Sequence, residues 1–277
     1  MRCRDKLAPE LITAKLRTSY LGRTIVYTPV TGSTNDDALR MGEERSKEGA
    51  KFVYPSGTLV LCETQTGGKG RLGRQWASPA GGIFMSLILR LDVPFSRLAA
   101  LPVVTGLSVA SAVRTATGLD AFIKWPNDVL VSGKKICGIL CEARLLPESH
   151  CVVAGIGINA NQAAEDFPAA LRESASSIRV VLGDAVDRNA LIAGVLNDME
   201  KALHDFLEHG LLNLQKRLND MCAYMDEPVA LSNRAEGDTE RISGVFRGVD
   251  SDGQALIEIP GQGIKAFPAG DLSLRPV

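Results

Sequence analysis

GGKGRLGR (residues 67–74) places four glycines and three cations in eight positions, with a single apolar residue, Leu72, among them. A flexible linker favours Gly and Ser without cations, and a solvated basic patch does not need glycines. The segment follows an apolar run, residues 57–63, that has the length and composition of a buried strand. The combination predicts a loop that leaves a strand end and closes over an anionic ligand.

KWPND (residues 124–128) is the second unusual stretch. Pro126 favours an extended conformation for Trp125, and a cation, an amide and a carboxylate surround the pair. As a plain turn, Pro-Asn-Asp would be unremarkable. A tryptophan and a lysine in the same five residues favour a binding site.

Other polar loops follow apolar strands, and each has a simpler explanation. TGSTNDD (31–37) either caps a helix or contacts a ligand, and Gln65 opens the glycine loop. The lysines of SGKK (132–135) belong to a hairpin turn and are solvated by default. The glycines of GIGIN (155–159) allow either close approach of a ligand to the backbone or plain close packing.

Composition describes an ordinary globular chain of 277 residues with 45% hydrophobic and 23% charged residues. The net charge of −1 gives no general attraction to nucleic acid, so no nucleic-acid partner is expected. The six cysteines and three histidines form no metal-ligand pattern, so no protein metal site is predicted. No run reaches the ~18 apolar residues of a membrane span, and no signal peptide is evident. A reduced cytoplasmic setting without membrane contact is the simplest expectation.

Periodicity predicts a mixed α+β fold. Helices are expected over 9–21, from a Ser33 or Thr34 cap through Met41, over 101–117 and over 189–209. Strands are expected over 23–27, 57–63, 82–89, 121–124, 129–131, 135–142 and 151–158. After Pro228 short apolar segments alternate with turns, which predicts a small all-β module of about 50 residues.

Two familiar nucleotide motifs are close but do not fit. The lysine of GGKG is not followed by Ser or Thr, and no helix begins there, so the loop is not a phosphate-binding P-loop. GIGINA (155–160) has the spacing of a dinucleotide fingerprint but runs into NQAAEDFP instead of a helix.

Taken in order, the motifs resemble those of the biotin protein ligases. The matching residues are Ser33, Thr34 and Asn35, then Gln65 with GGKGRLGRQW, then KWPND, then Lys135 with ICGIL, and then GIGIN. The tail GVFRGVDSDGQALIEI resembles the small C-terminal barrel of that family. The resemblance implies a mixed-sheet catalytic domain of the biotin/lipoate ligase type over 1–227 and an SH3-like domain over 228–277.

The resemblance also implies a chemistry. Ligases of this family activate biotin with ATP and Mg²⁺ to give biotinyl-5′-AMP, then transfer the biotinyl group to one lysine of a biotin carboxyl carrier protein such as that of acetyl-CoA carboxylase. Joining a carboxylate to a phosphate brings two anions together, so cations and amide donors are what the first step needs. The glycine loop would then close over the mixed anhydride and exclude water.

Roles can be carried over by residue. Arg71, Lys124, Asp128 and Lys135 are expected to be catalytic, and Lys124, Asn127 and Asp128 to orient the triphosphate and its metal. The residues expected to bind biotin or the adenylate are Ser33, Thr34, Asn35, Gln65, Gly68, Lys69, Gly70, Arg71, Trp76, Asn127, Lys135, Gly138, Gly155 and Asn159. The family more often has arginine where this chain has Lys69, and a lysine cannot make a bidentate contact.

Two alternatives remain at this point. A lipoate–protein ligase shares the activation step but carries a different glycine–arginine signature. A non-catalytic regulator that binds biotin or its adenylate is the other. Only about 20 residues precede the first expected strand, too few for a three-helix DNA-binding unit, so a ligase without operator binding is expected. The sequence leaves open whether the chain is a monomer or a homodimer.

Overall fold

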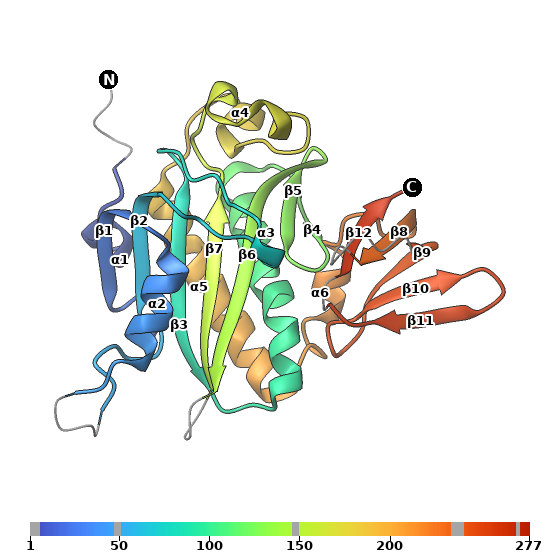
Figure 1. Cartoon of the computed structure of the whole chain (residues 1–277), viewed down its shortest axis with the longest axis horizontal. Helices are drawn as coiled ribbons and strands as arrows, with labels where there is room; N and C mark the ends of the chain where they lie inside the picture. The colour runs from blue at the N-terminus through green and yellow to red at the C-terminus, as the bar shows by residue number, and fades with distance from the viewer. Residues whose placement is uncertain (1–5, 47–50, 146–149, 234–240, 270–271) are drawn as a thin grey trace.

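Two β-sheets organise the chain (Figure 1). The structure is a computed structural model and describes residues 6–46, 51–145, 150–233, 241–269 and 272–277. The larger sheet contains β1 (Ile25–Thr31), β2 (Leu59–Gln65), β3 (Ile83–Leu91), β4 (Ala121–Lys124), β5 (Asp128–Val131), β6 (Lys134–Leu145) and β7 (His150–Ile158). Its order is β1-β2-β3-β7-β6-β5-β4, and only the β1–β2 pair is parallel, so the predicted mixed sheet is confirmed.

Helices cover both faces of this sheet. On one face α3 (Leu101–Thr117) and α5 (Arg188–His209) pack together over the large core, and on the other lies α2 (Thr34–Glu43) (Figure 1). Successive strand residues point to opposite faces, so Met85 and Leu87 of β3 join the large core while Ile88 packs under α2. The shorter helices are α1 (Pro9–Thr13), α4 (Ile178–Leu182) and α6 (Gln215–Asn219).

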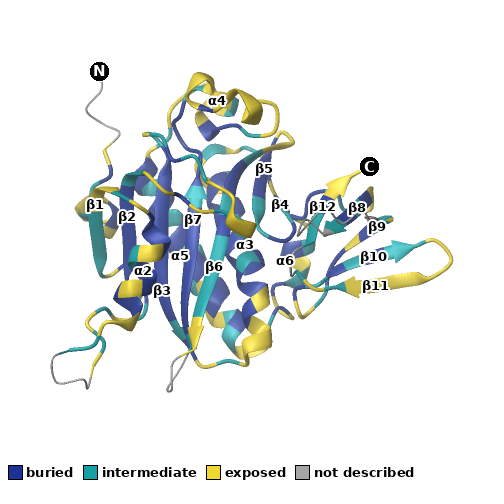
Figure 2. Ribbon diagram, viewed as in Figure 1, coloured by how far each residue is buried: buried dark blue, intermediate teal, exposed yellow. Residues whose placement is uncertain are grey.

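The central strands of the large sheet are buried, as Figure 2 shows for β3 and β7. Residues Phe95–Thr117, which include α3, are long and apolar enough to cross a membrane by length and composition, and their most apolar 18-residue window has a mean hydropathy of 1.4. However, 72% of the most apolar window is buried inside the protein. This is the pattern of a core helix, and it follows from packing against α5 and the sheet.

Most predicted elements are confirmed to within two or three residues, and α3 and β4 have the predicted bounds. Gly118 ends α3 as expected, with a φ of 73° and its N–H donating to Arg114 O. Ser33 rather than Thr34 is the N-cap of α2, because its Oγ accepts from Asp36 N.

Two predictions near the N-terminus were wrong. The helix expected over 9–21 ends at Thr13 and does not continue to Leu21, because side chains of α5 accept from backbone N–H groups within 17–21: Asn197 accepts from Arg17, and Glu200 accepts from Ser19, Tyr20 and Leu21. The strand expected over 23–27 instead covers Ile25–Thr31. It passes Pro29 because β1 is an edge strand, where a residue without an N–H is tolerated.

The C-terminal residues form a five-stranded antiparallel sheet that is consistent with an SH3-like module. Its strands are β8 (Pro228–Asn233), β9 (Arg241–Val249), β10 (Ala255–Ile259), β11 (Gly263–Phe267) and β12 (Leu272–Pro276), in the order β11-β10-β9-β8-β12.

Trp125 joins the two sheets. Its side chain is only 1% exposed, and its Nε1–H donates to Gly253 O, 3.0 Å away in the turn between β9 and β10. Gly253 has a φ of 83°, and a Cβ there would lie 2.8 Å from Ala100 Cβ. The tryptophan of KWPND is therefore a buried anchor between the sheets, and not a wall of the binding site as its sequence neighbours had suggested.

Candidate active site

Two adjoining cavities meet at the glycine loop, and the smaller of them lies beside the N-terminus of α2. The smaller, of about 60 Å³, is bounded by that helix end, the glycine loop and strands β3, β6 and β7. The larger, of about 640 Å³, extends from the glycine loop to β12 of the C-terminal sheet. Both cavities are lined by Gly70, Arg71, Trp76, Asn127 and Lys135. These five shared residues mark the junction.

The structure brings the predicted site residues together from distant parts of the chain. The smaller cavity is lined by Ser33, Thr34, Asn35, Gln65, Lys69, Gly70, Arg71, Trp76, Asn127, Lys135, Gly138 and Gly155, and the larger adds Lys124, Asp128 and Asn159. Of the predicted residues only Gly68 lines neither cavity. A Cβ at Gly68 would lie 2.5 Å from Trp76 O, so this glycine permits the loop to pack on itself.

Glycines on β6 and β7 make room for side chains above the sheet. Gly155 pairs with Ser86 and Leu140 on its two neighbouring strands, and a Cβ at Gly155 would lie 2.0 Å from Asn35 Oδ1. Two residues along, on the same face, Gly157 pairs with Gly138, and Cβ atoms on both would lie 2.7 Å from the indole of Trp76. Of the two explanations for the GIGIN glycines, close packing is the one seen at Gly155 and Gly157.

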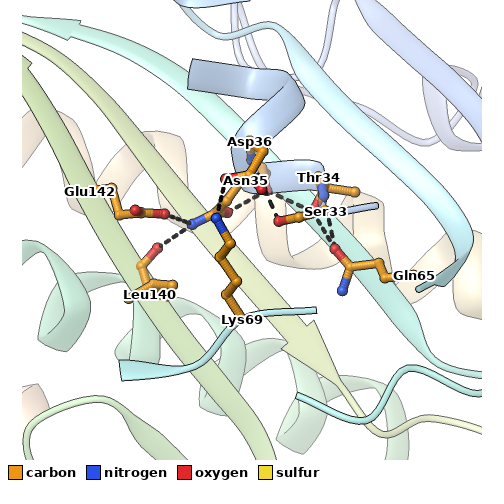
Figure 3. A network of polar contacts seen from close by, with 9 residues as sticks. Ser33, Thr34, Asn35, Asp36, Gln65, Lys69, Leu140 and Glu142 are labelled. Atoms are coloured by element: carbon orange, nitrogen blue, oxygen red, sulfur yellow. Dashed lines mark hydrogen bonds and ion pairs between the residues drawn. The ribbon is translucent and has the colours of Figure 1, made fainter. Parts of the chain in front are cut away.

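A hydrogen-bond network fixes the polar end of the smaller cavity (Figure 3). Gln65 Nε2 donates to Ser78 Oγ at 2.9 Å, which turns Gln65 Oε1 toward Thr34. That oxygen accepts from Thr34 N at 2.8 Å and lies 3.2 Å from Thr34 Oγ1. The ends of α2 and β2 are therefore held together around the cavity.

The side chain of Asn35, the second residue of α2, is buried between that helix and the sheet. Its Nδ2 donates to Glu142 Oε2 at 2.8 Å and to Leu140 O at 3.2 Å (Figure 3). Its Oδ1 accepts from Ser86 Oγ at 2.6 Å. All the polar atoms of the Asn35 amide group thus have partners within the protein.

Cations meet polar groups at the junction of the two cavities. Arg71 Nη1 donates to Asn127 Oδ1 at 3.0 Å, and Asn127 Nδ2 donates to Ile139 O at 2.9 Å, which sets the orientation of the amide. Lys135 Nζ lies 2.6 Å from Asp128 Oδ1 and 5.1 Å from the centre of the Trp76 ring. A guanidinium and an ammonium therefore face the same narrow opening.

Two further lysines differ in their surroundings. Burial lowers the pKa of the Lys124 ammonium, and the nearby Asp128 carboxylate partly offsets this effect. Lys69, by contrast, is half exposed and forms an ion pair with Asp36, with 2.6 Å between Nζ and Oδ1 (Figure 3). That hydrogen bond raises the pKa of Lys69. Lys69 is therefore the cation of this group with the most freedom to change partners.

Trp76 occupies the centre of the site. Its indole lies over Gly138 and Gly157, and its Nε1 is buried without a hydrogen-bond partner among the described residues. Asn159 lies deeper: it is 4% exposed, and its Nδ2 donates to Ser176 O at 3.0 Å.

Sequence reasoning missed residues that only the tertiary structure brings to the site. Tyr224, Ser273 and Arg275 line the larger cavity from the far end of the chain, and no local motif marks them. Ser86 and Glu142 form hydrogen bonds with the Asn35 amide, although neither lines the smaller or the larger cavity. Both lie inside runs that are typical of strands, so nothing in the sequence separated them from structural residues.

Known proteins resemble this chain in sequence and in fold. Residues 28–159 match the Biotin/lipoate A/B protein ligase family. The bifunctional ligase/repressor BirA of Bacillus spizizenii is 34% identical, over 97% of this chain and 79% of that protein. The biotin–[acetyl-CoA-carboxylase] ligase of Mycobacterium tuberculosis is 29% identical, over 98% of both chains.

Solved structures agree with these relatives. The biotin protein ligase from Aquifex aeolicus in complex with biotin and ATP superposes with a TM-score of 0.77 at 30% identity, covering 92% of this chain and all of that one. Sequence, fold and the arrangement of the motif residues lead to one assignment. The chain belongs to the biotin/lipoate A/B protein ligase family and is an enzyme of the biotin protein ligase type.

Proposed function

We propose that this ligase activates biotin with ATP and transfers the biotinyl group to a lysine of a carboxyl carrier domain. In the first step the biotin carboxylate attacks the α-phosphate, a P–O bond breaks and pyrophosphate leaves. In the second the lysine amine attacks the carbonyl of biotinyl-5′-AMP, loses a proton and displaces AMP. The observation that carries this proposal is the junction of a small and a large cavity at Arg71 and Lys135.

The smaller cavity suits the head of biotin. Its polar end offers the hydroxyl and amide groups of Ser33, Thr34 and Gln65, whereas Phe84, Met85 and Ile156 supply apolar surface. A ureido ring has N–H donors and a carbonyl acceptor on an otherwise apolar body, and needs both kinds of surface. The dithiolane of lipoate has no such donors, and this favours biotin over lipoate.

The junction suits the reacting groups. Two cations that face one opening lower the repulsion between a carboxylate and an α-phosphate and stabilise the charge that develops during transfer. Asn127, held by Ile139 O, orients Arg71 toward this point. The larger cavity beyond, with Lys124 and Arg275 among its lining residues, has the volume and charge for a nucleotide.

Magnesium fits as a partner of the nucleotide and not as a resident metal. In the described part of the chain no group of three His, Cys, Asp or Glu side chains could hold a metal ion. Asp128 offers one carboxylate and Asn127 one amide oxygen beside the larger cavity, a donor set typical of Mg²⁺ bound mainly through phosphates. When bound there, Mg²⁺ would neutralise phosphate charge.

Partner and setting are also proposals. The names of two relatives point to acetyl-CoA carboxylase, so we propose its carboxyl carrier domain as the protein substrate. The net charge of −1 gives no general attraction to nucleic acid, so no nucleic-acid partner is proposed. We assign catalysis to 1–227, with 228–277 completing the nucleotide cavity. The cysteines of the described chain are all free, which suits a reducing cytoplasm.

The decisive experiment is ATP–pyrophosphate exchange with biotin, lipoate or octanoate added separately. We expect exchange when biotin is added and none when lipoate or octanoate is added instead. Exchange with lipoate but not biotin would support a lipoate–protein ligase. Tight biotin binding with no exchange and no transfer to a carrier domain would support a non-catalytic regulator.

A further inference from the structure

We propose that Ser86 and Glu142 are positioning residues that determine the hydrogen-bond polarity of the binding site. Neither side chain lines the smaller or the larger cavity described above, yet both bind the amide of Asn35, one from each side. Through Asn35 they leave Ser86 Oγ as an acceptor for the Thr34 hydroxyl hydrogen. The inference rests on the proposed function only in that biotin is taken as the ligand.

The first step is the orientation of the Asn35 amide. An amide nitrogen only donates and an amide oxygen only accepts. The group that faces Glu142 Oε2 and Leu140 O must be Nδ2, because a carboxylate and a carbonyl are both acceptors. The carboxylate of Glu142 therefore forces Oδ1 toward Ser86.

The second step follows the single hydrogen of Ser86. Ser86 Oγ lies 2.6 Å from Asn35 Oδ1 and 2.8 Å from Thr34 Oγ1. Since Asn35 Oδ1 can only accept, the Ser86 hydrogen is committed to it. Ser86 Oγ is then left as an acceptor toward Thr34.

The third step reaches the cavity. The Thr34 hydroxyl hydrogen has two acceptors within the protein, Ser86 Oγ at 2.8 Å and Gln65 Oε1 at 3.2 Å. In both cases the hydrogen points into the protein, and the hydroxyl offers a lone pair to the cavity. The chain Glu142–Asn35–Ser86–Thr34 thus makes Thr34 an acceptor, suited to an N–H of the ligand.

The sheet explains why these residues meet. Ser86, Gly155 and Leu140 are paired in register across β3, β7 and β6, and Glu142 lies two residues beyond Leu140, on the same face of β6. The missing Cβ of Gly155 leaves the space that Asn35 fills. The register of three strands therefore builds the chain of contacts.

The first test removes the Ser86 donor. Ser86→Ala should raise the KM for biotin by roughly threefold to tenfold, the usual effect of one lost hydrogen bond, with the KM for ATP unchanged. Ser86→Cys leaves no cavity but donates only weakly, so it should show a similar change for a different steric reason. Ser108→Ala is the matched control, because Ser108 is equally buried but donates to Val104 O within α3.

The second test uses pH. Asn35→Asp would place a second carboxylate beside Glu142, and repulsion between the two raises the pKa of one of them. Below that pKa a shared proton restores the contact, and above it the carboxylates separate. The KM for biotin, relative to the parent protein, should therefore rise with increasing pH, by about tenfold once the shared proton is lost. Adding Glu142→Gln supplies an N–H donor and should remove this dependence.

Other charged groups near Glu142 stay the same in all these variants. They are the Lys69–Asp36 ion pair. The nearby thiol of Cys141 is uncharged over this pH range, because burial raises its pKa to about 12. Taking each variant relative to the parent at every pH cancels their titration.

The outcomes are separable. A parent protein without biotin-dependent exchange would refute the proposed function. If the parent is active, two results would refute the positioning roles. One is a KM for biotin in the Ser86 variants equal to that of Ser108→Ala. The other is a pH profile of Asn35→Asp that does not change when Glu142→Gln is added. Rescue of the pH profile by the second substitution supports them, because it requires the Asn35 and Glu142 side chains to be coupled through their contact.

Discussion

Gly155→Ala tests how closely α2 is packed on the sheet. The added Cβ would lie 2.0 Å from Asn35 Oδ1, 2.7 Å from its Cγ and 2.8 Å from its Nδ2. Distances under about 3 Å require one group to move, and Asn35 cannot move without breaking contacts to Ser86, Glu142 and Leu140. Three hydrogen bonds at about 1 kcal/mol each give an expected loss of roughly 2–4 kcal/mol in the free energy of unfolding.

The measurement is urea unfolding of the ligand-free protein, with Gly194→Ala as the matched control. Gly194 lies within α5, and a Cβ there would be at an ordinary 3.6 Å from Ala112 Cβ. Alanine favours helix over glycine, so the control should gain about 0.5–1 kcal/mol. We also expect Gly155→Ala to raise the KM for biotin and not that for ATP. A Gly155→Ala protein as stable as the parent, with unchanged KM values, would refute the packing argument.

Four further predictions concern single side chains. Arg71→Ala should slow adenylate formation about tenfold to a hundredfold, because one charge-assisted contact is worth roughly 1.5–3 kcal/mol; single-turnover rates within twofold of the parent would place Arg71 outside the site. Lys69→Arg should be tolerated, whereas Lys69→Ala should release adenylate and label bystander proteins; if all three forms behave alike, Lys69 is only the exposed partner of Asp36. Arg188→Ala should cost about 3–5 kcal/mol in urea unfolding, because Arg188 is 3% exposed and pairs with Glu63 at 2.8 Å; a loss below about 1 kcal/mol would contradict this. Burial opposes ionisation of Glu200, but hydrogen bonds from the backbone N–H groups of Leu21, Ser19 and Tyr20 outweigh it and lower the pKa of Glu200 below 4.5. The free energy of unfolding of the parent should therefore fall more steeply than that of Glu200→Gln as the pH drops below about 4.5. Equal slopes for the two proteins in this pH range would contradict the prediction.

Local patterns predicted much of the fold. The apolar repeat of 101–117 ends at a glycine with left-handed backbone, and α3 has those bounds. The error in the N-terminal helix has a cause outside the local sequence. Residues 17–21 were expected to continue the helix, but α5, about 180 residues later, offers Asn197 and Glu200 as partners for the N–H groups of Arg17, Ser19, Tyr20 and Leu21. No window of local sequence contains that competition.

The same division holds at the site. By itself the sequence determined the glycine loop, the KWPND lysine and aspartate and the hydroxyls of α2, because these residues combine charge, amides and glycine in a way that ordinary turns do not need. Only the tertiary structure decided that Trp125 is a buried anchor, that Gly155 makes room for Asn35, and that Ser86 and Glu142 stand behind the cavity wall. The physical reason is register: which side chains meet across β3, β7 and β6 depends on strand pairing between distant segments, and a shift by one residue would turn each of these side chains to the opposite face.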